Sequence, residues 1–297
     1  MGVATPAEEL AVPVVRERTS ARVLRVLGRT PVHLFLVLVG FLWLVPTVAL
    51  FLTSVLPSDQ INSQGWWNIF SKPSLFTWEN YREIFNNDAI TSSLLTTLWI
   101  TIGGTILPIV IASAAAYAFA WLEFPGRDWI FIVVIGLLVV PLQMALIPMF
   151  SLYNDLGIFD TVISLILFHT AFALPFAIFL LRNFFAGIPK ELLEAARIDG
   201  ASELRIFLRV ILPLGLPAIA SLAIFQFLWT WNDLLVALTL GRDTQPITVA
   251  IFSQLRQFGS NLDLIAPASF VSLAIPLVVF FAFQRYFVQG VLAGSVK

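Results

Sequence analysis

The chain has 297 residues, of which 59% are hydrophobic and only 12% are charged, and its mean hydropathy is +0.90. A soluble domain is about half apolar and about a quarter charged, so this composition excludes a water-soluble fold and predicts an integral membrane protein. The net charge of −1 gives no field that favours nucleic acid, and the absence of cysteine excludes disulfides and thiolate metal sites. His33 and His169 lie far apart in sequence, so we expect no metal or other cofactor on this chain.

Six stretches free of Asp, Glu, Lys and Arg are long enough to cross a membrane, since a helical span needs about 20 mainly apolar residues. These stretches do not alternate polar and apolar residues as the strands of a membrane barrel do. The sequence therefore predicts an all-α membrane protein with six transmembrane helices. The expected helices cover residues 33–55, 92–118, 129–150, 161–182, 212–235 and 264–285.

The distribution of basic residues predicts the orientation of the spans, because cytoplasmic loops carry an excess of Lys and Arg. With both termini in the cytoplasm, 13 of the 17 Lys and Arg residues fall on the cytoplasmic side. The other four are Lys72, Arg82, Arg242 and Arg256. We therefore expect a disordered cytoplasmic tail over 1–30, a membrane domain over 31–297, and a cytoplasmic C-terminal tail over 286–297.

Residues 56–90 and 236–263 are the long loops expected on the external side. The first is rich in aromatic side chains: Trp66, Trp67, Phe70, Phe76, Trp78 and Tyr81. Such residues are typical of an aromatic belt at headgroup depth, and they equally suit a docking surface for an external partner.

The cytoplasmic loop 184–213 predicts two short helices joined at a glycine. Pro189 suits the first position of a helix and Glu191 its positive end, while Gly200 can adopt φ > 0 and stop that helix. Ser202 then suits the N-cap of a second helix that ends near Pro213. A rigid hairpin of this kind fits a surface on which a soluble partner pushes, and equally an amphipathic interfacial connection between two spans.

The same loop resembles the signature loop of binding-protein-dependent ABC importer permeases. That signature is E-A-A, three residues, Gly, nine residues, Ile, one residue and Leu-Pro. At this spacing the chain has Glu194, Ala195, Ala196, Gly200, Val210, Leu212 and Pro213. Val210 in place of Ile is a conservative departure.

More of the chain, roughly residues 30–297, is similar to the smaller permease subunit of maltose-type sugar importers. The similar segments are 188–191, 195–201, Val140-Pro141 to Ile147-Pro148, 229–233 and the tail from Gln284. The resemblance implies a type I ABC importer permease in the cell (plasma or inner) membrane. Its expected partners are a second homologous permease, two ATPase subunits that carry ATP and Mg²⁺, an external solute-binding protein, a sugar and membrane lipid.

Within that resemblance, the loop 184–213 corresponds to the coupling helices that sit in a cleft of the ATPase. The coupling residues that it implies are Glu194, Ala195, Ala196, Asp199, Gly200, Leu212 and Pro213. We expect Glu194 to pair with a basic group of the ATPase. In the family, the C-terminal tail reaches into the ATPase dimer and the loop 236–263 probes the binding protein.

The chain cannot hydrolyse ATP through a phosphate-binding loop, because none of its three lysines follows a glycine as G-x-x-x-x-G-K-[ST] requires. An ion-coupled carrier usually has ionisable residues within its spans, and these spans have none away from their ends. An importer of glycerol phosphate, peptides or amino acids, or a membrane scaffold, remains an alternative. Polar and aromatic residues that suit a sugar pathway are Gln143, Gln226, Trp229, Trp231 and Asn232, although helix–helix hydrogen bonding would explain the polar ones as well.

Overall fold

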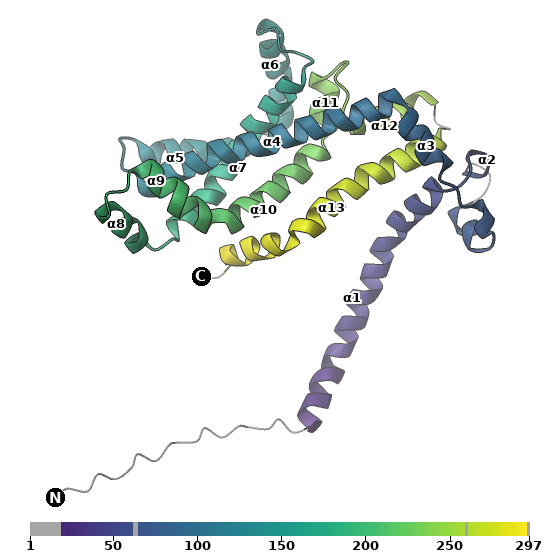
Figure 1. Cartoon of the computed structure of the whole chain (residues 1–297), viewed down its shortest axis with the longest axis horizontal. Coiled ribbons are helices and arrows are strands. Elements are labelled where there is room, and N and C mark those ends of the chain that lie inside the picture. The colour runs from purple at the N-terminus through teal and green to yellow at the C-terminus, as the bar shows by residue number, and fades with distance from the viewer. Residues whose placement is uncertain (1–18, 62–64, 259–260, 296–297) are drawn as a thin grey trace, which may run out of the picture. The chain divides into compact units, whose positions relative to one another are not determined.

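The computed structural model describes residues 19–61, 65–258 and 261–295, which form two units, 1–49 and 50–297. The described part of the first unit is a single helix, α1 (Thr19–Ser54), whose last residues belong to the second unit. The prediction of a disordered tail over 1–30 is therefore wrong for residues 19–30, which are helical (Figure 1). Residues 1–18 of that predicted tail lie outside the described residues.

Four long helices make up most of the second unit: α4 (Asp88–Trp121), α7 (Val162–Ala186), α10 (Leu212–Trp231) and α13 (Leu262–Ser295). α4 packs along α7, and α10 packs against α4, α7 and α13 (Figure 1). Five helices of the described chain, α1 included, are long and apolar enough to cross a membrane. A sixth span is present if the bent pair that follows α4 crosses as one, so the predicted all-α architecture is confirmed.

The predicted continuous helix over 129–150 is wrong. The segment forms α5 (Arg127–Gly136), a 3₁₀ turn (Leu137–Val139) and α6 (Leu142–Asp155), with a bend of 101° between the two arms. Val140 and Pro141 are both extended, with ψ of 115° and 130°. Proline disfavours the α conformation of the residue before it, and two successive extended residues leave no helical hydrogen bonding across the junction.

Small residues let the long helices approach one another closely. A Cβ atom added at Gly215 would lie 2.5 Å from the ring of Phe185, and one added at Gly104 would lie 3.1 Å from Thr230. Close contact of this kind is the main source of helix association within a membrane, where lipid tails are as apolar as the helices. α10 is therefore held tightly against both α7 and α4.

Both long connections are ordered where they are described. Residues 56–90 contain α2 (Ser58–Ile61), two 3₁₀ turns (Trp66–Phe70 and Pro73–Leu75) and α3 (Glu79–Asn86). Trp66 and Tyr81 pack against a buried apolar cluster there, whereas Trp67, Phe70, Phe76 and Trp78 stay exposed. The second connection contains α11 (Leu235–Leu240) and α12 (Ile247–Phe258).

Candidate functional site

The predicted hairpin is present between α7 and α10. α8 (Lys190–Ile198) is followed by a glycine elbow and by α9 (Glu203–Ile206). Gly200 has a φ of +77°, its N–H donates to the carbonyl of Arg197, and the N–H of Ala201 donates to the carbonyl of Ala196. These two hydrogen bonds form a Schellman motif, the helix ending that glycine favours because the left-handed conformation has no Cβ penalty there. The expected elbow is therefore confirmed.

The start of the second helix differs from the prediction in two respects. Ser202 occupies the N-cap position but its side chain makes no capping hydrogen bond. The helix does not end near Pro213, because α9 passes through a π-helical turn (Phe207–Ile211) directly into α10. Pro213 lies in the first turn of α10, where a missing N–H is tolerated. α9, the π-turn and α10 are thus one continuous helical rod, to which α8 is joined at the Gly200 elbow.

The motif residues of the hairpin lie on its surface. Glu194, Ala195, Asp199 and Gly200 are exposed, Ala196 and Leu212 are half-buried, and Pro213 is exposed. Among the described residues the carboxylate of Glu194 pairs only with Lys190 one turn earlier, at 3.7 Å between charged atoms, and its side chain is 56% exposed, so it is accessible to a partner. Leu192, Ile198 and Leu204 add exposed apolar area, and Ile198 is 86% exposed. Charged and apolar groups therefore share one accessible surface.

The opposite side of the hairpin is anchored in a buried cluster. Leu193 of α8, Ile206 of α9 and Ile211 of the π-turn are at most 1% exposed, and they pack with Tyr117 of α4 and Phe185 of α7. Each buried side chain of this size contributes about 1.5–3 kcal/mol. The hairpin is therefore fixed to the helix bundle.

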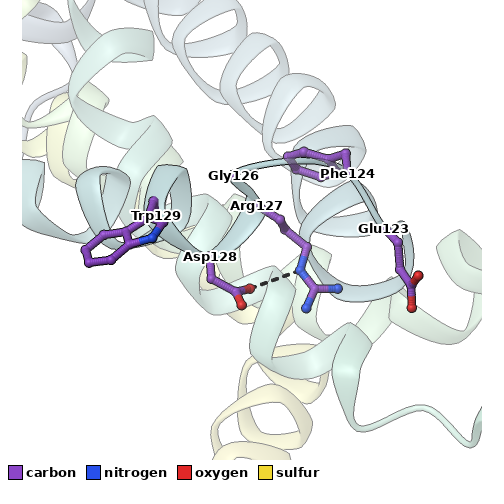
Figure 2. Close-up of a pocket in the computed structure, with 6 residues that line it drawn as sticks. All are labelled: Glu123, Phe124, Gly126, Arg127, Asp128 and Trp129. Atoms are coloured by element: carbon purple, nitrogen blue, oxygen red, sulfur yellow. Dashed lines mark hydrogen bonds and ion pairs between the residues drawn. The ribbon is translucent and has the colours of Figure 1, made fainter.

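A hollow of about 310 Å³ lies beside this end of the bundle, at the turn between α4 and α5. Figure 2 shows Arg127 turned toward Asp128, to which it donates a hydrogen bond of 3.0 Å, with Trp129 pointing away. Glu123 also lines the hollow, so acidic groups outnumber the single arginine. We assign it no ligand.

The other end of the bundle carries a second ordered structure, built on the segment between α10 and α12. The carboxylate of Asp233 accepts hydrogen bonds from the N–H groups of Val236 and Ala237 in the first turn of α11 and lies 3.6 Å from Nε2 of His169. His169, on α7, is 1% exposed. The carboxylate of Asp233, which directly follows the C-cap of α10, therefore links α7 to the first turn of α11.

Asp160 clamps the same segment from the loop before α7. Its carboxylate accepts hydrogen bonds from the backbone N–H groups of Arg242, Asp243 and Thr244, at 2.7 to 3.0 Å, and its own φ is +59°. Burial raises the pKa of Asp160, but these N–H donors outweigh burial and hold the pKa below its usual value. Sequence reasoning missed this residue, because an aspartate in a Gly-Ile-Phe-Asp loop has no distinctive pattern.

The residues predicted to line a sugar pathway do not form one cluster. Trp229 is 42% exposed and lines a pocket of about 270 Å³ between α7 and α10, together with Gln226 and the rings of Phe172, Phe176 and Phe225. Gln226 also donates a hydrogen bond to the carbonyl of Gly104 on α4, so it serves helix packing as well.

The other three predicted pathway residues lie away from this pocket. Trp231 is 1% exposed and donates from its indole N–H to the carbonyl of Ser272, so it cannot stack on a sugar in this arrangement. Asn232 is exposed and its side chain donates to the carbonyl of Leu228. Gln143 is exposed on α6, beyond the 101° bend.

A bundle of membrane-length helices with an ordered, exposed hairpin at one end and a clamped loop at the other defines a multi-pass permease. Comparison with known proteins gives the family. The model of the family described as "Binding-protein-dependent transport system inner membrane component" matches residues 109–293, more than half of the chain. The chain belongs to this family of ABC importer permease subunits, which are not themselves enzymes.

Several relatives and solved structures are similar over most of the chain. It is 46% identical to the osmoprotective compounds uptake permease protein GgtD of Synechocystis sp. over 275 residues, which cover 91% of this chain and 92% of GgtD. It is 50% identical to the alpha-glucoside transport system permease protein AglG of Rhizobium meliloti over 233 residues, which cover 76% of this chain and 61% of AglG.

The fold itself matches a chain from the crystal structure of a bacterial ABC transporter involved in the import of the acidic polysaccharide alginate. The TM-score is 0.70 at 20% identity, and the match covers 91% of this chain and 98% of that one. At this identity the likeness supports the fold alone.

Proposed function

We propose that this chain forms one half of the membrane pathway of an ATP-driven importer for sugars. The other half is a second, homologous permease, two ATPase subunits bind below the pair, and an external solute-binding protein delivers the sugar. The observation that carries the proposal is the hairpin at 190–206. Glu194 and Ala195 of its E-A-A sequence are exposed on α8 just before the glycine elbow, while the other side of the hairpin is buried in the bundle.

The substrate that we propose is a neutral disaccharide, oligosaccharide or related glycoside. The relatives named above are permeases for osmoprotective compounds and for alpha-glucosides. The pocket between α7 and α10 supports the same chemistry, since it combines aromatic faces with one amide and no charged group. Aromatic rings and an uncharged amide suit a sugar, whereas a phosphate or a free amino acid requires charge.

The hairpin transmits force between ATPase and bundle. ATP and Mg²⁺ bind to the partner ATPase, and closure of the ATPase dimer pushes on the surface that carries Glu194. Because the π-turn joins α9 to α10 without a break, the push moves α10 and, through the contact of Gly215 with Phe185, α7. The cavity then alternates between the two sides of the membrane, and hydrolysis resets it.

The orientation that we propose places the hairpin and both termini in the cytoplasm, as the basic-residue bias predicts. The segment 242–244, which Asp160 clamps, then faces outward, toward the binding protein. An importer for glycerol phosphate, peptides or amino acids is the competing function, and an ion-coupled carrier is a more remote one.

The test is ATP hydrolysis by the complex that co-purifies with this chain, reconstituted in lipid with its binding protein. A panel of sugars is compared with glycerol phosphate, a peptide and an amino acid. We expect one sugar-loaded binding protein to stimulate hydrolysis and Glu194→Lys to abolish the stimulation. Stimulation by a non-sugar solute would overturn the substrate class, and absence of any ATPase under mild detergent would overturn the importer.

A further inference from the structure

Three polar side chains from three different helices meet at the inner side of the hairpin. Arg197 of α8 donates to both carboxylate oxygens of Glu203 on α9, at 2.9 Å from Nε and 3.3 Å from a terminal nitrogen. The hydroxyl of Tyr117, on α4, donates to the same carboxylate. Glu203 therefore joins α8, α9 and α4 at one point.

The geometry of this contact makes it stronger than an ordinary surface ion pair. The side chains of Arg197 and Glu203 are 41% and 45% exposed, where a simple ion pair contributes little, but bidentate pairing of Arg with a carboxylate adds strength and fixes orientation. The ring of Tyr117 is 5% exposed and lies 5.3 Å from the ring of Phe207, so the phenol has little freedom to leave. The fixed hydroxyl of Tyr117 holds the carboxylate of Glu203 in place, and this carboxylate in turn holds the guanidinium of Arg197.

α4 connects this point to the far end of the bundle. It is helical from Asp88 to Trp121, so Tyr117 and Thr97 lie about 30 Å apart on one rod. The side-chain oxygen of Thr97 accepts a hydrogen bond of 2.7 Å from the N–H of Ile247. Ile247 lies three residues after Thr244, the last residue that Asp160 clamps. A displacement of α4 along its axis therefore reaches both ends.

We propose that Arg197, Glu203 and Tyr117 are positioning residues that make α8, α9 and α4 move as one body. A push on α8 then reaches α4 directly, in addition to α10, and α4 carries it to the segment at 247. Without this link, α8 could turn about the elbow at Gly200 with no polar contact to resist it. The inference rests on the proposed coupling role of the hairpin and adds a second path for it.

The test uses Tyr117→Phe in the complete reconstituted complex. The substitution removes one hydroxyl and keeps the buried ring, so assembly and basal ATP hydrolysis should stay at wild-type levels. We expect sugar transported per ATP hydrolysed to fall about fivefold or more, the lower end of the usual range for coupling between sites. The matched control is Arg205→Gln, which removes an exposed arginine of α9 that has no ion pair in the described structure.

A double-mutant cycle separates a coupled contact from independent local effects. If Glu203 acts through the hydroxyl of Tyr117, adding Tyr117→Phe to Glu203→Gln should lower the transport ratio less than it does in the wild type. If the two effects add fully, or if Tyr117→Phe alone keeps the wild-type ratio, the link is refuted. Wild-type complex that lacks ATPase or sugar uptake refutes the proposed function itself, so the two failures are distinguishable.

Discussion

Replacing Gly200 by valine isolates the conformational requirement of the elbow. The φ of Gly200 is +77°, and a Cβ atom added there would meet no atom within 4 Å. An added Cβ atom therefore clashes with nothing outside its own backbone. The cost of Gly200→Val that follows from the structure is that of forcing an L residue into the left-handed conformation.

That cost can be estimated. The left-handed conformation costs an L residue about 1–2 kcal/mol, and a β-branched residue lies at or above the top of this range. Since about 1.4 kcal/mol changes an equilibrium tenfold, the correctly folded elbow of Gly200→Val loses roughly 30-fold or more in population against its alternatives. Asparagine tolerates this conformation, so we expect Gly200→Asn to transport nearly normally, with Gly200→Ala between the two.

The assay is binding-protein-dependent sugar uptake with ATP hydrolysis measured on the same vesicles. Gly157, in the turn before α7, is a matched control because its φ is +69° and it too has no neighbour within 4 Å of an added Cβ. Gly157→Val introduces the same strain outside the hairpin and should leave the ratio of sugar to ATP unchanged. Normal uptake by Gly200→Val at normal expression, or an equal loss in Gly157→Val, would refute the role of the elbow.

Three further predictions concern single residues. Glu194→Lys should lower stimulated ATP hydrolysis at least about tenfold, whereas Glu191→Lys on the same helix should leave most of it. Equal loss in both variants would contradict a specific contact between Glu194 and the ATPase. Asp160→Ala should increase proteolysis at 242–244 at neutral pH. The pKa of Asp160 in the folded protein lies below its ordinary value of 3.8. In the wild type the clamp should therefore hold above pH 3.8 and weaken as the pH falls through the folded pKa. Cleavage that depends neither on the substitution nor on the pH would refute the clamp. Trp229→Ala should raise the half-saturating sugar concentration for uptake by roughly two- to tenfold, and an unchanged value would remove it from the pathway.

The sequence predicted the elements whose cause is local. Long apolar runs determined α4, α7 and the body of α10, because the length of an apolar segment is itself the requirement for a span. The elbow was predictable for the same reason, since Gly200 ends α8 through its own conformational freedom. These predictions needed no knowledge of which helix lies beside which.

The break within 129–150 could not be predicted in this way. Pro108, Pro175 and Pro217 lie inside unbroken helices, so a proline alone does not mark a break. Prolines are tolerated in membrane helices because neighbouring groups satisfy the freed backbone carbonyls. At Pro141 the preceding residue, Val140, is extended, as a following proline favours, whereas the residues before Pro108, Pro175 and Pro217 stay helical although the same local effect acts on them.

Contacts between distant segments explain the remaining omissions. Tyr117 and Glu203 are 86 residues apart in sequence. Asp160 lies 82 to 84 residues before the backbone N–H groups from which its carboxylate accepts hydrogen bonds. Each looks like an ordinary residue in its own segment. Trp231 shows the opposite error, a pathway residue predicted where there is none. Its aromatic side chain near the end of a span suggested stacking on a sugar, whereas its buried indole N–H donates a hydrogen bond to the carbonyl of Ser272.

The placement of these polar contacts matters for how an importer of this kind can work. Between its ends the bundle is held mainly by close packing, as at Gly215, and by the hydrogen bond of Gln226 to the carbonyl of Gly104. Directional links occur at the two ends, through Glu203 at the hairpin and through Asp160 at the opposite segment. A stiff core with oriented contacts at both ends transmits a push as a displacement of whole helices.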